Sequence, residues 1–185
     1  IFTRTKHRAK ALTRQLVAKG VPAVEMHGNL SQNVRVRNLA AFSEGRAAAL
    51  VATDIAARGI HVDEVGLVVH ADPPVEHKAY LHRSGRTARA GNDGTVVTLA
   101  MPDQRRDVEQ LARKAGISPT VHATRPGDAV LERLAPGVRT TLDAAAMAAA
   151  LPTAPAQQQG SGGGGGRRSK GRARAGAGSG QQRQG

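Results

Sequence analysis

The sequence predicts a three-layer α/β domain over residues 1–118, in which helices cover both faces of a parallel sheet. Two observations lead to this fold class. Short apolar runs alternate with amphipathic stretches through the region, as strands alternate with helices in such folds. The runs at residues 47–52 and 66–71 are apolar at consecutive positions, which is typical of strands that helices cover on both sides.

Three strands and two helices are expected in the first half of the domain. The patterns place strands at residues 1–5, 22–26 and 47–52 and helices at residues 8–19 and 32–43. Gly20 stands where the first helix would end, because glycine is enriched just past helix C-termini. Ser31 is a suitable N-cap for the second helix. The side chains expected to face inward are Ala11, Leu12, Leu16 and Val17 in the first helix and Val36, Leu39, Ala40 and Phe42 in the second.

The second half of the domain repeats this alternation. Strands are expected at residues 66–70 and 95–100, and a short helix at residues 76–83 lies between them. Pro102 and Asp103 start a last helix that runs to residue 115, since proline suits the first helical position.

The composition changes after residue 118. Residues 119–156 are rich in proline and alanine and contain two short expected helices, at residues 128–134 and 142–151. Residues 157–185 are a Gly/Gln/Arg-rich tail that cannot bury enough apolar surface to offset its ordering entropy, so we expect it to be disordered. It contains six cations and no acid: Arg167, Arg168, Lys170, Arg172, Arg174 and Arg183. The tail is interpreted as an electrostatic tether for nucleic acid, with an inert solubilising segment as the alternative.

The overall composition restricts the partners of the chain. A formal net charge of +13 and a pI near 11.5 indicate a polyanionic partner. No apolar run reaches the roughly 18 residues that cross a bilayer, so a membrane span is excluded. The absence of cysteine fits a cytoplasmic protein, and the seven histidines show no metal-ligand spacing, so no metal site is expected. Only Phe2, Phe42 and Tyr80 are aromatic, so a nucleic acid would be held mainly by its backbone, without sequence preference.

One segment concentrates positive charge. Residues 80–91 contain His82, Arg83, Arg86 and Arg89 among small and polar residues. In a helix, three of these cations would share one stripe with no apolar side chain to cover. Such a stripe predicts a surface that receives a strongly negative group, and arginine suits phosphate because its planar fork donates two parallel hydrogen bonds. The alternative is a solvated basic face.

Three further segments, at residues 1–6, 27–39 and 51–62, lie at expected strand ends, where ligands bind in open α/β sheets. Gly28 permits close approach of a ligand to the backbone, and the helix start near Gln32 offers amide groups to an anion. Gln32 and Arg35 lie on one helical face. Each feature by itself is also explained by a solvated surface.

Taken together, the segments IFTRTK, HGNLSQNVR, VATDIAARG and HRSGRTAR resemble, in order and spacing, four motifs of the C-terminal RecA-like domain of a bacterial-type DEAD-box ATP-dependent RNA helicase. The resemblance covers residues 1–118. It implies a RecA-like fold, ATP with Mg²⁺ as cofactor, RNA as partner, and an N-terminal RecA-like domain of the same chain as the other half of the enzyme.

The resemblance also implies roles for individual residues. Arg86 and Arg89 match arginine fingers that reach the γ-phosphate of ATP and offset charge on the transferred phosphoryl group. Roles in ATP binding and interdomain coupling are implied for Asp54, Arg58, Gly59, His61, His82 and Arg83. Contacts to RNA phosphates are implied for Thr5, Gly28, Gln32, Arg35 and Thr53.

The chain departs from the family pattern at two positions. His61 stands where the family commonly has an acid that contacts the ATP ribose, and an imidazole accepts a hydrogen bond less strongly. Asn29 replaces a usual aspartate, which changes little because both residues cap helices well.

Two motifs of the complete family pattern are missing. The chain contains no GxxxxGK[ST] loop to hold phosphates and no Asp-Glu-Ala-Asp segment to hold magnesium. Both are expected upstream of Ile1, so these 185 residues alone are expected neither to bind ATP tightly nor to unwind RNA. Two alternatives remain open: a DNA helicase of the same superfamily, and a non-enzymatic RNA-binding or annealing module that acts through the basic tail.

Overall fold

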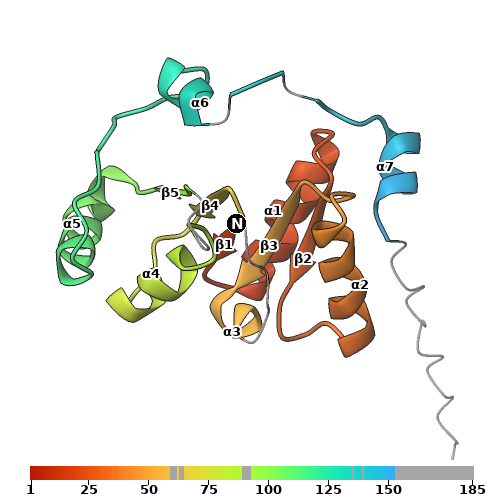
Figure 1. The fold of residues 1–185 in the computed structure, drawn as a ribbon, viewed down its shortest axis with the longest axis horizontal. Helices are drawn as coiled ribbons and strands as arrows, with labels where there is room; N and C mark the ends of the chain where they lie inside the picture. The colour runs from red at the N-terminus through yellow and green to blue at the C-terminus, as the bar shows by residue number, and fades with distance from the viewer. Residues whose placement is uncertain (59–61, 63–64, 89–92, 135, 139, 153–185) are drawn as a thin grey trace, which may run out of the picture. The chain divides into compact units, whose positions relative to one another are not determined.

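The structure of the chain is a computed structural model that describes residues 1–152 except 59–61, 63–64, 89–92, 135 and 139 (Figure 1). The chain divides into two units, Ile1–Thr153 and Ala154–Gly185, and the second lies outside the described residues. The domain boundaries expected at residues 118 and 156 therefore remain predictions. None of the described helices is both long and apolar enough to cross a membrane.

Five parallel strands form one sheet in the order β2-β3-β1-β4-β5 (Figure 1). The strands are β1 (Phe2–Thr3), β2 (Ala23–Met26), β3 (Ala49–Thr53), β4 (Leu67–His70) and β5 (Thr95–Thr98). Each lies within an expected strand segment except β3, which extends one residue further. Central β1 pairs with β3 on one side, through Phe2 and Ala52, and with β4 on the other, through Phe2 and His70.

Helices cover both faces of this sheet. The described helices are α1 (Lys6–Ala18), α2 (Gln32–Ser43), α3 (Asp54–Ala57), α4 (His77–Ser84), a 3-10 turn η1 (Pro102–Gln104), α5 (Arg105–Lys114), α6 (Ala129–Leu134) and α7 (Ala144–Ala150), of which α1 and α2 contribute most to covering the sheet. From β1 the chain moves outward through α1 to edge strand β2 and then returns through α2 to β3. Crossovers between parallel strands are almost always right-handed, and this rule places α1 and α2 on opposite faces. The three-layer α/β class is confirmed.

Hydroxyl caps fix the starts of the two longest helices. The Oγ1 of Thr5 accepts a hydrogen bond from the amide of Arg8 at 3.1 Å, so α1 begins two residues before the expected start and β1 ends early. The expected cap at Ser31 is confirmed: its Oγ accepts from the amide of Val34 at 3.4 Å. Thr5 was expected to contact RNA, and its hydroxyl has this structural role as well.

Two residues expected inside are exposed. Val36 of α2 is 58% exposed, and Ala11 of α1 is also exposed. In α2 the fully buried residues are Asn38 and Ala41, and the expected Leu39 and Phe42 are half-buried and pack against the core. Asn38 is tolerated there because its side-chain amide donates to the carbonyl of Glu25 at 2.9 Å. Apolar spacing placed the helix and its core-facing side correctly, and it missed Asn38 because a polar residue is buried there only when it finds a hydrogen-bond partner.

The end of the C-terminal extension, around α7, packs against the sheet domain. The amide of Leu142, just before α7, donates to the carbonyl of Gly20 at 2.8 Å, and Nη1 of Arg46 donates to the carbonyl of Ala150 at 3.1 Å. Leu151 contacts the apolar cluster between α2 and the sheet. Gly20 has φ of +80°, as expected for a glycine that ends a helix. The two short helices expected in the extension are present as α6 and α7.

Candidate functional site

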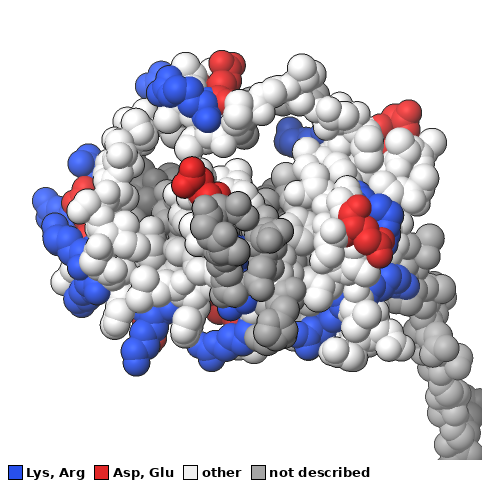
Figure 2. All heavy atoms as spheres, in the orientation of Figure 1, with Lys and Arg blue, Asp and Glu red and all other residues white. Residues whose placement is uncertain are grey.

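The candidate functional residues lie where the parallel strands end. Parallel strands present all their carboxyl ends at one edge of the sheet, and ligands bind at that edge in open α/β folds. The loops after β1, β2 and β3 carry three of the expected sites, at Thr5, Gly28 and Asp54. Figure 2 shows Lys and Arg side chains along the lower rim of the view, where α3 and α4 lie in Figure 1.

The loops after β1 and β2 are joined directly. Nζ of Lys6 donates to Oδ1 of Asn29 at 3.2 Å. Next to Asn29, a methyl group built on Gly28 would meet no atom within 4 Å, so the backbone there is open to a ligand. On α2, Nη1 of Arg35 donates to Oε1 of Gln32 at 3.4 Å, which confirms that these two residues share one helical face.

A second hydrogen bond of Arg35 links α2 to α3. Its Nη2 donates to the carbonyl of Ala56 at 3.3 Å, so the guanidinium spans from the second loop to the third. Thr53, at the end of β3, is buried with 8% exposure and therefore presents little surface to a ligand. Arg58 and His82 are exposed.

Arg83, one of the four clustered cations, does not face outward. It is 2% exposed and forms a two-pronged ion pair with Asp54, with distances of 2.6 Å from Nε to Oδ1 and 2.7 Å from Nη2 to Oδ2. Its Nη1 donates to the carbonyl of Asp72 at 2.8 Å, and its guanidinium lies 5.4 Å from the ring centre of Phe2. The stripe itself is not formed, because α4 ends at Ser84, before Arg86.

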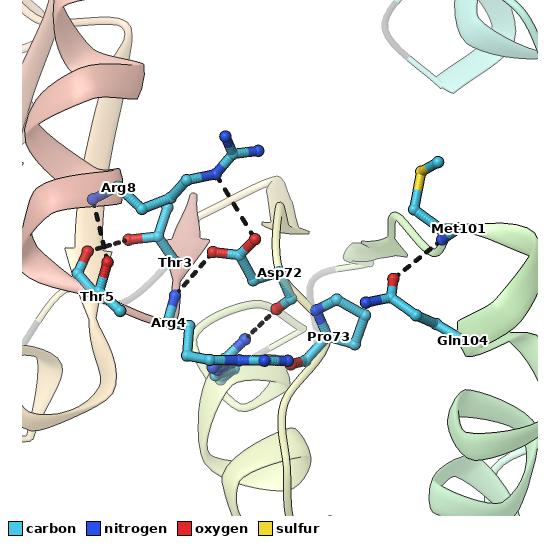
Figure 3. A network of polar contacts seen from close by, with 9 residues as sticks. Thr3, Arg4, Thr5, Arg8, Asp72, Pro73, Met101 and Gln104 are labelled. Carbon is cyan, nitrogen blue, oxygen red and sulfur yellow. Dashed lines mark hydrogen bonds and ion pairs between the residues drawn. The ribbon is translucent and has the colours of Figure 1, made fainter.

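Asp72 completes this network and was not found from the sequence. Its Oδ2 accepts from the amide of Arg4 at 2.9 Å, and its Oδ1 lies 3.6 Å from Nε of Arg8 (Figure 3). The end of β4 is thus bound to the end of β1, to α1 and, through the Asp72 carbonyl, to Arg83. The available signal was an acid two residues after an apolar strand.

His70 lies beneath the network. It is fully buried, and its Nδ1 lies 2.9 Å from Oγ1 of Thr98. The rings of Phe2 and Tyr80 meet its imidazole edge-on, with centres 6.2 Å and 5.1 Å away. Burial first, and then the charge of Arg83, lowers the pKa of His70 to about 4, although Asp54 acts in the opposite direction.

The low pKa of His70 predicts a loss of stability in acid. Between about pH 6.5 and about pH 4 the unfolded chain binds a proton at this residue and the folded chain does not. The free energy of unfolding therefore decreases as the pH is lowered through this range, by roughly 3 kcal/mol in total. Urea unfolding at several pH values measures this. In a His70→Gln variant the stability should fall less steeply over the same range. An equal slope in both proteins would contradict the prediction.

The segment after α4 holds Arg86. This side chain is half-buried and borders an apolar cavity between the sheet and α2, together with Phe42 and Leu50. Thr87 is buried with 4% exposure, and Ala88 has φ of +54°, a conformation that costs a non-glycine residue free energy. The surrounding structure therefore holds this segment in one specific path.

Gly94 is part of that surrounding structure. A methyl group there would lie 2.5 Å from the amide nitrogen of Ala88 and would also collide with the hydroxyl of Thr87. We expect Gly94→Ala to displace the segment after Arg86 and to lower the free energy of unfolding by about 1–3 kcal/mol. Denaturant unfolding tests this, with Gly66→Ala as the matched control, because a methyl group at Gly66 meets no atom within 4 Å. Equal stabilities of the two variants would argue against this account.

Several expected site residues lie outside the described part of the chain. They are Gly59, His61, Arg89 and the tail cations Arg167, Arg168, Lys170, Arg172, Arg174 and Arg183. Their roles remain predictions, as does the effect of His61 on ribose binding.

Comparisons with known proteins identify relatives of this arrangement. The model of the helicase conserved C-terminal domain matches residues 1–91. The chain is 32% identical to the E. coli DEAD-box protein SrmB, in a structure bound to regulator of ribonuclease activity A, with a TM-score of 0.61 over 77% of this chain and 79% of that one. A DEAD box protein from the hyperthermophile Methanococcus jannaschii has 31% identity and a TM-score of 0.60, over 63% of this chain and 32% of that one. This likeness confirms the expected RecA-like class.

Curated sequences give the same relationship. The ATP-dependent rRNA helicase RRP3 of Saccharomyces cerevisiae is 46% identical over 99 residues, which are 54% of this chain and 20% of that protein. The chain spans 12% to 20% of the length of the curated relatives that it matches first. Because these relatives include yeast proteins, the bacterial type expected from the sequence remains a prediction.

Proposed function

Because this chain belongs to the DEAD-box helicase family, as its conserved C-terminal domain, we propose that it forms one half of an ATP-dependent RNA helicase. The observation that carries this proposal is the contact between the ends of three strands and the segment that holds Arg86. Arg83, three residues before Arg86, binds Asp54 after β3 and the carbonyl of Asp72 after β4. A ligand at the strand ends and a nucleotide at Arg86 would thus act on one connected network.

The RNA would be held by its phosphates at the carboxyl edge of the sheet. Gln32, Arg35 and the open backbone at Gly28 supply donors and space there. Base stacking has little support, because Phe2 and Tyr80 are buried and Phe42 is half-buried. Contact through the backbone alone makes the binding independent of sequence.

The contribution to ATP hydrolysis would come from Arg86 and Arg89. A guanidinium offsets negative charge on the phosphoryl group as it is transferred. Arg86 borders the apolar cavity in this structure, so it would turn toward the nucleotide when the two halves of the enzyme close. Asp54, Arg58 and His82 would couple this movement to RNA. The described residues contain no cluster that could hold a metal ion, and Mg²⁺ would enter with ATP bound to the N-terminal RecA-like domain.

The tail would hold RNA near the domain. Its six cations and lack of acids favour attraction to phosphates over a long stretch of chain. We propose a cytoplasmic protein, in line with the absence of cysteine.

Nucleic-acid-stimulated ATP hydrolysis by the complete protein tests the proposed function. Single-stranded RNA should stimulate turnover, single-stranded DNA of the same sequence should do so much less, and the 185-residue chain alone should hydrolyse no ATP. Equal stimulation by DNA would favour the DNA helicase. RNA annealing without any ATP hydrolysis, lost on deletion of residues 157–185, would favour the non-enzymatic module.

A further inference from the structure

Helix α1 carries exposed positive charge in every turn except the last. Its thirteen residues contain no acid, and its four Lys and Arg side chains are all exposed. These are Lys6, Arg8, Lys10 and Arg14, and Lys19 follows as the exposed C-cap residue. Cations therefore accompany the helix from its first residue to its C-cap, although none lies in its last turn.

This arrangement opposes the stability of the helix. Lys6 and Arg8 lie in the first turn, where the helix dipole favours acids over cations. Lys10 lies four residues from Lys6 and four from Arg14, and like charges at this spacing repel each other. A chain of phosphates along the helix would relieve both effects.

The cations differ in what already binds them. Lys6 donates to Asn29, and Arg8 lies beside Asp72 at 3.6 Å. Among the described residues, no carboxylate lies within 4 Å of the charged nitrogens of Lys10, Arg14 and Lys19. The charge of the second half of α1 is therefore available to a partner.

The helix also has a suitable position and length. It begins at Thr5, at the edge of the sheet where RNA would be held, and it ends near Gly20, where Leu142 and α7 pack. Thirteen residues extend about 20 Å, which is the length of about six phosphates at duplex spacing.

We propose that the outer face of α1 is a second contact surface for the RNA backbone, and that Lys10, Arg14 and Lys19 bind phosphates flanking the segment held at the strand ends. This inference rests on the proposed function, because it extends the same RNA path. RNA is favoured over an acidic protein because the cations of α1 begin at Lys6, whose Nζ donates to Asn29 in the loop where RNA phosphates are proposed to bind.

The test is a triple variant, Lys10→Gln, Arg14→Gln and Lys19→Gln, in the complete protein. Glutamine keeps the helix propensity of the residues it replaces. The matched control is Arg106→Gln, Arg113→Gln and Lys114→Gln, which removes three exposed cations from α5. The probes are two uridine homopolymers. The short one has about six nucleotides, enough to span a five-stranded sheet, and the long one has about twenty nucleotides.

Three results are expected from equilibrium binding at several salt concentrations. The α1 variant should bind the long RNA at least about tenfold more weakly at low salt. The slope of the logarithm of its binding constant against the logarithm of salt concentration should be smaller in magnitude by about 2, because each of the three lost phosphate contacts contributes about 0.7. Its affinity for the short RNA should change less than about twofold, since those phosphates lie at the strand ends. The α5 control should resemble the unmodified protein with both probes.

Other results separate the inference from the proposed function. If the α5 control loses as much RNA affinity as the α1 variant, only net charge matters, and the second contact surface on α1 is refuted. The same holds if the α1 variant binds long RNA normally while RNA still stimulates ATP hydrolysis. If the unmodified protein binds neither RNA, or binds only an acidic polypeptide such as polyglutamate through α1, the proposed function fails as well.

Discussion

Alanine in place of Arg86 in the complete protein is expected to lower RNA-stimulated ATP turnover by about 10³- to 10⁵-fold, the contribution of an arginine finger in related phosphoryl-transfer enzymes. The physical reason is the loss of a permanent positive charge next to the phosphoryl group during transfer. RNA affinity should change little, because Arg86 borders a cavity between the sheet and α2 and does not belong to the loops proposed to hold RNA.

Steady-state ATP hydrolysis at saturating RNA measures the effect. Arg106→Ala serves as the matched control, since it removes an exposed arginine from α5. Denaturant unfolding of both variants shows whether a loss of turnover reflects a loss of folding. Turnover by a folded Arg86→Ala protein at the level of the control would contradict the finger role.

Alanine in place of Arg83 is expected to cause the largest loss of stability. Arg83 is 2% exposed, and its removal leaves the carboxylate of Asp54 without the two hydrogen bonds at 2.6 Å and 2.7 Å. Breaking a buried pair in this way costs about 3–5 kcal/mol. Asp54 is 35% exposed, so water can solvate part of its charge, and we expect a value near 3 kcal/mol. The free energy of unfolding in urea measures it.

Two further variants identify the cause of this loss. Arg105→Ala breaks an exposed pair with Glu109 at 2.8 Å and should change stability little. Arg83→Lys keeps the charge but cannot donate two parallel hydrogen bonds, so its stability should lie between those of the alanine variant and the unmodified protein. A lysine variant as stable as the unmodified protein would show that charge alone is required.

The class of the fold and the order of its elements were accessible from the sequence. Apolar runs and helix-ending residues such as Gly20 act locally, because they depend on backbone preferences and on burial of neighbouring side chains. The cap at Ser31 and the shared face of Gln32 and Arg35 were predicted for the same reason. α3 was not predicted, because four residues are too few to show a helical period.

What the sequence pattern could not reveal depends on contacts between distant segments. In the sequence, Arg83 is one of four clustered cations that predict an exposed surface. It is buried because the fold brings Asp54, 29 positions away in the chain, within hydrogen-bond distance. Asp72 carries no recognisable motif, and it acquires its role only when parallel strands bring Arg4 and Arg8 beside it. Electrostatic pairing depends on distance in space, so the local pattern supplied the charges and the packing of the sheet determined which of them became partners.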